Sequence, residues 1–120
     1  MSDLTIINLP EPPSVNRLYG VGKNGRRYRT VKYQEWANAA GWCVIQARIA
    51  GKIPVHGKYT VLVELSDKSR LDADNSIKAC LDLLVNMTVT PDDRHCVKAT
   101  AVKCDWIDRG KCRVILGEAA

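Results

Sequence analysis

Apolar residues recur along the chain with two different spacings, and each spacing predicts one kind of secondary structure. Short segments that alternate apolar with polar positions, or that are rich in β-branched residues, predict strands. Longer segments with apolar residues three and four positions apart predict amphipathic helices. The predicted strands are residues 4–9, 59–66, 96–103 and 112–116, and the predicted helices are residues 31–50 and 73–87.

The order of these elements is strand, helix, strand, helix, strand, strand. This order predicts a two-layer α+β fold, in which two helices pack on a mixed β-sheet. The length of 120 residues suits a single domain, residues 1–120. The turn sequence from Asp108 to Lys111 predicts that the last two strands form a hairpin. Residues 20–30 are glycine-rich and basic, which predicts either a loop or a two-stranded flap.

The first predicted helix is apolar on two opposite faces. Trp42, Ile45 and Ile49 form the smaller stripe. Either a second layer of the same chain covers Trp42 or another subunit does. A chain this short has little material for a third layer, so we favour a homodimer. The larger stripe, which we expect to face the sheet, consists of Tyr33, Trp36, Ala37, Ala40, Cys43, Val44 and Ala47.

Composition limits the class of protein. With 46% hydrophobic and 26% charged residues, the chain has the composition of a folded soluble protein. No apolar run approaches the roughly 18 residues of a membrane span, and the N-terminus does not resemble a signal peptide. We therefore expect a cytoplasmic protein without a membrane partner. The five cysteines include no C-x-x-C pair, and Cys43 and Cys80 fall on apolar helix faces, which predicts core thiols rather than a zinc site.

Basic residues give the chain a formal net charge of +5 and are concentrated between Pro12 and Gln34, where no acidic residue occurs. Such a patch suits the phosphates of a nucleic acid, although a solvated basic loop would have the same composition. Two arginines next to the acidic residues are further candidates for DNA contacts. The full set of candidates is Arg17, Lys23, Arg26, Arg27, Arg29, Lys32, Arg70 and Arg94.

Four aspartates of this basic chain occur at two points. Asp72 and Asp74 stand at the start of the second predicted helix, and Asp92 and Asp93 follow its end. The simpler explanation is that Asp72 caps the helix and Asp74 favours its first turn, with Lys78 as an ion partner. The alternative is that the returning strand carries Asp93 back to the helix start, where the carboxylates hold a hard cation such as Mg²⁺. A few acids in a basic protein suit a metal-dependent phosphodiesterase.

Two motifs together resemble the RusA family of Holliday junction resolvases. One is D-x-D-N-x-x-K at residues 72–78, followed by the Asp92–Asp93 pair, and the other is LPEPPSVNRLYG at residues 9–20. The resemblance spans most of the chain. It implies a small, dimeric, Mg²⁺-dependent endodeoxyribonuclease, of a kind often encoded by prophages, with no organic cofactor. Such enzymes bind four-way DNA junctions and cut two strands of like polarity symmetrically.

The resemblance also implies roles for individual residues. It assigns metal binding and catalysis to Asp72, Asp74 and Asp93, and it makes Lys78 an essential cation near the scissile phosphate. Asp93 is preferred over its neighbour Asp92 by alignment of the pair. Asn75 and Asn16 would support the site.

Three functions remain open at this point. The leading one is resolution of Holliday junctions, and the second is a less selective nuclease that cuts flaps or forks. The third is a non-catalytic DNA-binding module whose acids only cap a helix. Some resolvases distort the junction with inserted apolar side chains. Tyr19, Tyr28 and Trp106 are equal candidates for that role.

Overall fold

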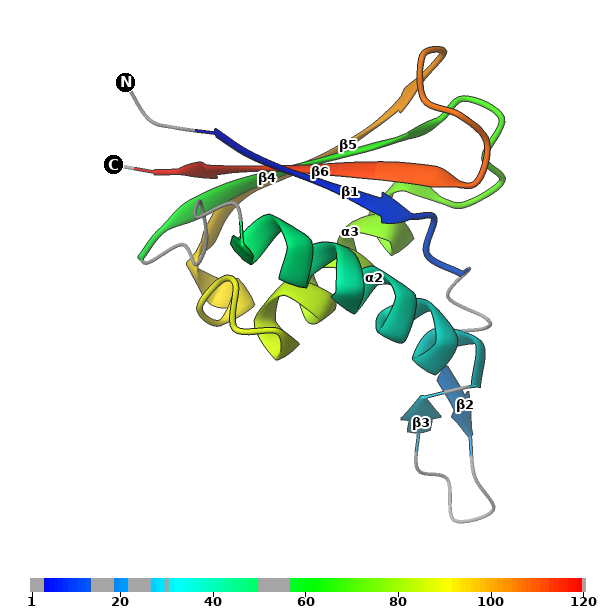
Figure 1. The fold of residues 1–120 in the computed structure, drawn as a ribbon, viewed down its shortest axis with the longest axis horizontal. Coiled ribbons are helices and arrows are strands. Elements are labelled where there is room, and N and C mark those ends of the chain that lie inside the picture. The colour runs from blue at the N-terminus through cyan, green and yellow to red at the C-terminus, as the bar shows by residue number, and fades with distance from the viewer. Residues whose placement is uncertain (1–3, 14–18, 22–26, 30, 50–56, 120) are drawn as a thin grey trace.

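The computed structural model describes residues 4–13, 19–21, 27–29, 31–49 and 57–119. Four strands form one mixed sheet, and two helices cover one of its faces (Figure 1). The predicted two-layer α+β fold is thereby confirmed. The elements of the two layers are β1 (Leu4–Pro10), α2 (Val31–Ile49), β4 (Tyr59–Ser66), α3 (Ala73–Asn86), β5 (Cys96–Cys104) and β6 (Lys111–Glu118).

A small two-stranded sheet extends away from this body (Figure 1). It consists of β2 (Tyr19–Val21) and β3 (Arg27–Arg29), which pair in antiparallel fashion. Of the two expectations for residues 20–30, the two-stranded flap is the correct one. No helix in the part of the chain that the structure describes is long and apolar enough to cross a membrane.

The strand order in the main sheet is β1-β6-β4-β5, with β4 and β5 parallel and the other pairs antiparallel. The predicted hairpin between β5 and β6 is therefore wrong. The turn itself forms, because the Lys111 N–H donates to the Asp108 carbonyl at 3.0 Å. The turn instead leads the chain to the far side of β4, where β6 lies between β1 and β4. The buried Val114 and Leu116 suit such a central strand. The largely exposed β5 suits an edge.

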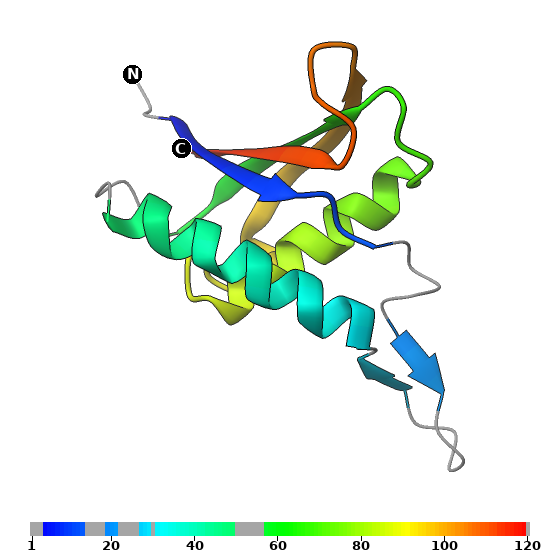
Figure 2. The same ribbon diagram turned by 45° about the vertical axis from the view of Figure 1, so that its right-hand side comes forward.

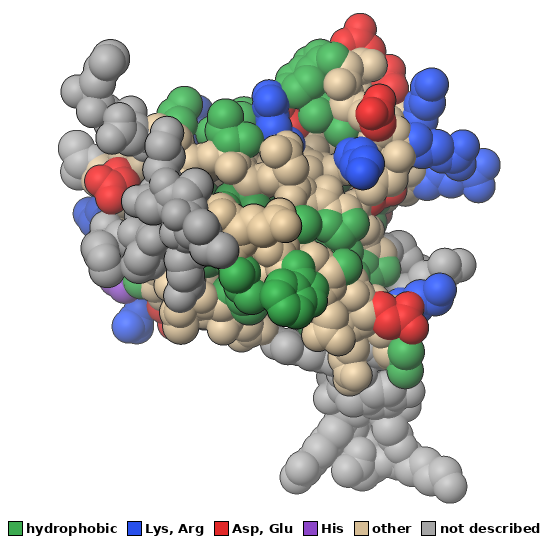
Figure 3. Space-filling view, viewed as in Figure 1, with side chains coloured by type: hydrophobic (Ala, Val, Ile, Leu, Met, Phe, Trp, Pro, Cys, Tyr) green, Lys and Arg blue, Asp and Glu red, His purple; other side chains and the backbone are tan. Residues whose placement is uncertain are grey.

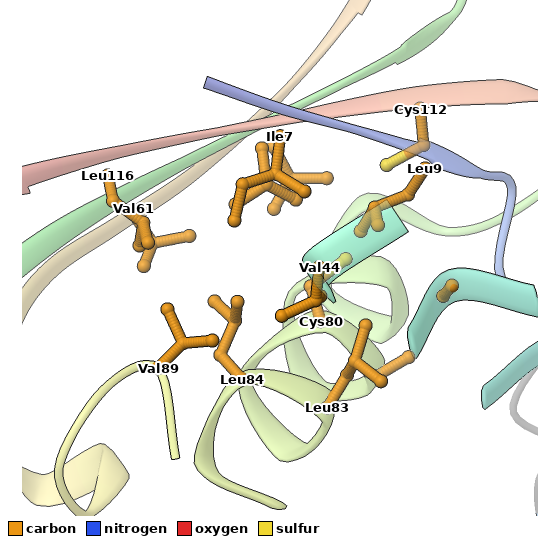
Figure 4. Packing of buried hydrophobic residues seen from close by; sticks show 14 of the residues in the cluster. Ile7, Leu9, Val44, Val61, Cys80, Leu83, Leu84, Val89, Cys112 and Leu116 are labelled. Carbon is orange, nitrogen blue, oxygen red and sulfur yellow. The ribbon is translucent and has the colours of Figure 1, made fainter. Parts of the chain in front are cut away.

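The core lies between the sheet and the two helices (Figure 4). Every second residue of β4 and β6 points toward the helices, and the expected main stripe of α2 meets them. Four members of that stripe are buried and Ala37, Cys43 and Ala47 pack at the margin of the core. Cys80 is buried in the core as expected, and all five cysteines are free thiols.

The inward face of α3 differs from the one expected from its large apolar residues. Helical spacing of the large apolar residues alone would put Ile77, Leu81, Leu84 and Val85 on that face, but only Leu84 is fully buried, while Ile77 and Leu81 pack at the margin of the core. The small side chains of Ser76 and Ala79 are buried. Their size allows the helix backbone to approach the sheet closely at these positions. The buried residues of α3 are Ser76, Ala79, Cys80, Leu83 and Leu84.

The second apolar stripe of α2 is not covered by any described part of the chain. Trp42 is 68% exposed and Ile45 is 40% exposed, while the side chain of Ile49 lies outside the described residues. Figure 3 shows apolar side chains on the outer surface of α2. A second layer of the described chain is thus excluded as the cover for Trp42.

The direction of α3 decides where the acidic residues lie. Because β4 and β5 are parallel, the helix that connects them has to run back along the sheet. It begins at the sheet end where Ser66 pairs with Cys104, and it ends where Tyr59 pairs with Cys96 (Figures 1 and 2). The two aspartate pairs therefore lie at opposite ends of α3.

Candidate functional site

Asp72 occupies the N-cap position of α3, as the sequence predicts. Its backbone is extended, with φ −66° and ψ 139°, and its carbonyl accepts a hydrogen bond from the Ser76 N–H at 3.2 Å. The carboxylate, however, makes no capping hydrogen bond. Its one described polar neighbour is the Asn75 amide, whose Nδ2 lies 3.5 Å from Oδ2. The exposed carboxylate of Asp72 is therefore available to a ligand from outside the chain.

Asp74 and Lys78 extend this site along the helix. Asp74 lies in the first turn of α3, where a negative charge interacts favourably with the helix dipole. Lys78 follows four residues later and is exposed, as are Asp74 and the preceding Arg70. Residues four positions apart lie on the same side of a helix. The start of α3 thus carries two carboxylates with a lysine one turn away.

Charged side chains of both signs gather over the end of the sheet where β4 ends and β6 begins (Figure 3). One group there is an ion pair on the sheet face opposite the helices, in which Arg113 Nε lies 2.6 Å from Glu64 Oε1. The Arg113 guanidinium also lies 4.4 Å from the ring centroid of Trp106, which is 54% exposed. The structure thus anchors Trp106 on the open face of the sheet.

Asp92 and Asp93 belong to the short 3₁₀ helix η1 (Asp93–His95) or its cap. Asp92 Oδ1 accepts a hydrogen bond from the Arg94 N–H at 3.1 Å, which lowers the pKa of Asp92. The carboxyl group of Asp93 hydrogen-bonds to Asp92, and this contact is the main reason that the pKa of Asp93 is raised. The negative charges of Asp92 and Asp82 raise it further. Arg94 is exposed next to the pair.

The expectation that Asp93 lies beside Asp72 and Asp74 in one protomer is wrong. Asp93 instead interacts with Asp82 in the second half of α3 and with Tyr59 at the start of β4. Helix α3 has 14 residues, and it therefore separates the two aspartate pairs by about 20 Å. Asp93 stays at the far end of α3 because it precedes β5, and only β5 returns along the sheet toward the start of α3. Among the described residues, no group of three or more acidic, histidine or cysteine side chains is placed to hold a metal ion.

Several predicted contact residues cannot be located. Asn16, Arg17, Lys23 and Arg26 lie outside the described residues. Arg27 and Arg29 form part of β3, but their side chains are not described. Lys32 is exposed in the first turn of α2. The predicted basic surface stays a prediction.

Sequence reasoning missed a group of residues directly before the acidic motif. The loop of residues 67–71 is fixed by Ser69, which is 8% exposed and bonds to Glu11 and Lys103. These partners stand 58 and 34 positions away in the sequence. No local motif signals such contacts.

The structure therefore defines a two-layer α+β protein with two aspartates at a helix start, where the Asp72 carboxylate makes no capping bond and Arg70 and Lys78 are exposed nearby. The family model described as Endodeoxyribonuclease RusA matches residues 10–115. Since this match covers most of the chain, the protein belongs to the RusA family, whose members are nucleases that act on Holliday junctions. The expected resemblance is confirmed. A search among curated proteins finds no match to the sequence.

Proposed function

We propose that this protein is a Mg²⁺-dependent endonuclease that resolves four-way DNA junctions by paired, symmetric cleavage. Family membership supports nuclease activity on branched DNA. The observation that carries the metal proposal is the start of α3, where the Asp72 carboxylate makes no capping bond and Asp74 is exposed nearby. A carboxylate with a purely structural role as a cap would bond to the helix N–H groups.

The residues at the start of α3 fit the requirements of a hard cation. Mg²⁺ is bound by one or two carboxylates together with water and substrate phosphate oxygens, and Asp72 and Asp74 supply such carboxylates. When bound, the metal would activate a water molecule and stabilise negative charge on the phosphate. Asn75 orients the Asp72 carboxylate. Lys78 stabilises the charge that develops on the phosphate oxygens.

Arg70 and Arg94 are exposed at opposite ends of α3 and bind backbone phosphates in this proposal. Phosphate contacts of this kind position the protein on DNA without reading its sequence. The exposed Lys32 belongs to the same set, together with the basic residues of the segment 17–29. Binding to the junction should accordingly weaken as the salt concentration rises.

Asp93 keeps its proposed role as a metal ligand only if it comes from a second copy of the chain. A two-fold axis that places two copies of α3 antiparallel would bring the start of each helix beside the end of its partner. Asp93 of the partner subunit would then complete the site at Asp72 and Asp74. A four-way junction has near two-fold symmetry, so a dimer with two such sites matches two symmetric cuts.

The uncovered stripe around Trp42 supports a homodimer, because a large exposed apolar patch is typical of an interaction surface. Gly41 and Met87 lie beside Trp42 and shape a shallow hollow of about 340 Å³ on this surface. We propose that a second copy of the chain covers the stripe.

Cleavage of a labelled four-way junction by wild type and by Asp72→Asn tests the proposed function. The wild type should cut the junction with Mg²⁺ and not with a chelator, and it should cut flap and linear duplex substrates far less. Asp72→Asn should bind the junction normally and not cut it. Cleavage by this variant at the wild-type rate would refute the assignment of Asp72, and equal cutting of flaps would favour a less selective nuclease.

A further inference from the structure

Ser69 stands three residues before Asp72 and uses each of its polar groups. Its N–H donates to the Ser66 carbonyl at 3.0 Å, and its Oγ accepts from the Leu71 N–H at 3.1 Å. The same hydroxyl donates to a carboxylate oxygen of Glu11, and the Ser69 carbonyl accepts from Lys103 Nζ at 2.9 Å. This nearly buried serine therefore connects the loop before α3 to two charged side chains.

The two charged partners come from opposite edges of the sheet. Glu11 directly follows β1 at one edge, and Lys103 lies in β5 at the other. Glu11 is itself fixed, because its N–H donates to the Gly110 carbonyl at 2.9 Å. Figure 2 shows that the exit of β1 and the start of α3 lie at the same end of the molecule. Two opposite charges, one just after an edge strand and one in the other edge strand, thus meet on one loop residue.

Backbone N–H groups of the loop also donate to the last residues of β4 and β5. The Asp67 N–H donates to the Cys104 carbonyl at 2.9 Å, and the Lys68 N–H donates to Ser66 Oγ at 3.1 Å. A loop that only connects β4 to α3 does not need this many long-range bonds. A loop that presents two carboxylates does, because like charges repel each other and a metal requires fixed ligand positions.

We infer that Glu11 and Lys103 are positioning residues for the acidic pair Asp72 and Asp74, and that both act through Ser69. They hold the loop so that the two carboxylates are in place before the metal binds. Neither side chain contacts the metal or the DNA in this role, which resembles that of outer partners in other metal sites. The inference rests on the proposed function, since it assumes that Asp72 and Asp74 bind a metal.

Manganese binding to the full-length protein, measured by calorimetry without DNA, provides the first test. Glu11→Met and Lys103→Met should each weaken Mn²⁺ binding about tenfold, because each removes one bond to Ser69. The sign of the Lys103 result is decisive. If Lys103 acted only through its charge, its removal would reduce repulsion of the cation and tighten Mn²⁺ binding. Unchanged or tighter binding by Lys103→Met would overturn the inference.

Amide hydrogen exchange of the metal-free protein provides the second test. The Leu71 amide, which donates to Ser69 Oγ, should exchange about tenfold faster in Lys103→Met and in Ser69→Ala, whereas core amides of β4 should not change. Lys103→Arg should restore slow exchange, since an arginine can donate to the same carbonyl. Wild-type exchange at Leu71 in Lys103→Met would contradict the inference even if the metal affinity fell.

Two control variants remove a charge from the sheet at positions without a described contact to Ser69. Lys98→Met removes a lysine from the opposite face of β5, and Glu118→Met removes an exposed carboxylate at the end of β6. Both should bind Mn²⁺ like the wild type. A loss of affinity equal to that of the Lys103 and Glu11 variants would show a general charge effect and overturn the inference.

Junction cleavage separates failure of this inference from failure of the proposed function. If the wild type cuts junctions and the Lys103 and Glu11 variants bind Mn²⁺ normally, only the positioning role is wrong. If the wild type binds Mn²⁺ and the variants bind it weakly, but no junction is cut, the positioning role stands and the proposed function fails. If the wild type binds no Mn²⁺, both are wrong.

Discussion

The two ends of α3 carry aspartate pairs that look alike in the sequence and differ in the structure. At the first end, Asp72 occupies the cap position without using its carboxylate as a cap. At the far end, the Asp92 carboxylate accepts the Arg94 N–H and is hydrogen-bonded to Asp93. The first pair therefore has carboxylate oxygens available for a ligand, whereas the second is partly used by its own turn. Of the second pair, Asp93 is the better candidate ligand, because Asp92 is held by the cap.

Mixing two inactive variants provides the strongest test of how the two ends of α3 cooperate. Asp72→Asn and Asp93→Asn should each abolish cleavage. In a mixed dimer, the partner subunit's Asp93 would meet an intact Asp72 at one of the two sites, so mixing should restore nicking of one strand. A gel that separates nicked from resolved junctions measures this result.

The complementation experiment has a clear opposite outcome. If both carboxylates of a site came from one protomer, neither chain of the mixed dimer would carry a complete site, and mixing would restore nothing. The control is a mixture of Asp72→Asn with Asp74→Asn. Both changes lie at the same end of α3, so that mixture should stay inactive under either arrangement.

Lys78→Met should lower kcat for junction cleavage by about a hundredfold, because the variant loses a positive charge near the reacting phosphate. Junction binding in the presence of a chelator should change less than threefold, since Lys78 acts mainly in the transition state. Single-turnover cleavage and gel-shift titrations separate the two effects. Lys58→Met, at an exposed lysine before β4, is the matched control and should cut normally. An equal loss of binding and cleavage would make Lys78 a simple DNA contact.

Trp42→Glu should convert the proposed dimer to a monomer, since a buried carboxylate would replace an apolar contact in the interface. Light scattering measures the mass directly. Cleavage should fall in parallel if the site needs Asp93 of the partner subunit. Gln34→Glu adds the same charge at an exposed polar position of α2, about two turns before Trp42, and should leave the dimer intact. A dimeric Trp42→Glu variant would exclude this surface as the interface.

The sequence predicts those features of the fold that depend on local periodicity. Strand β4 occupies the residues expected, and α2 ends within one residue of the expected position, because burial of one face imposes a regular pattern. The pairing of β6 depends on contacts distant in the sequence, and a turn signal alone suggested the wrong partner. The error over Asp93 has the same origin, since a parallel crossover places the two ends of α3 apart.

The candidate site is predictable to a similar extent. The motif at residues 72–78 identifies the family and the acidic helix start, because these residues are close together in the sequence. The bonds from Glu11 and Lys103 to Ser69 could not be predicted, since each joins segments that meet only in the folded sheet. Burial of small residues such as Ala79 was also missed, because hydrophobic periodicity gives most weight to large side chains.

The smallest expected effect concerns the charge state of the second pair. The pKa of Asp93 is raised chiefly by its hydrogen bond to Asp92, then by desolvation, and further by the Asp92 charge. Asp92→Asn keeps an oxygen that can accept the Arg94 N–H but removes this charge, so the pKa of Asp93 should fall toward its ordinary value. Carbon-13 NMR titration of the aspartate carboxyl groups measures the change. An unchanged Asp93 titration would mean that the two carboxyl groups do not share a proton. Asp92 and Asp93 would then titrate independently although they are neighbours in the sequence.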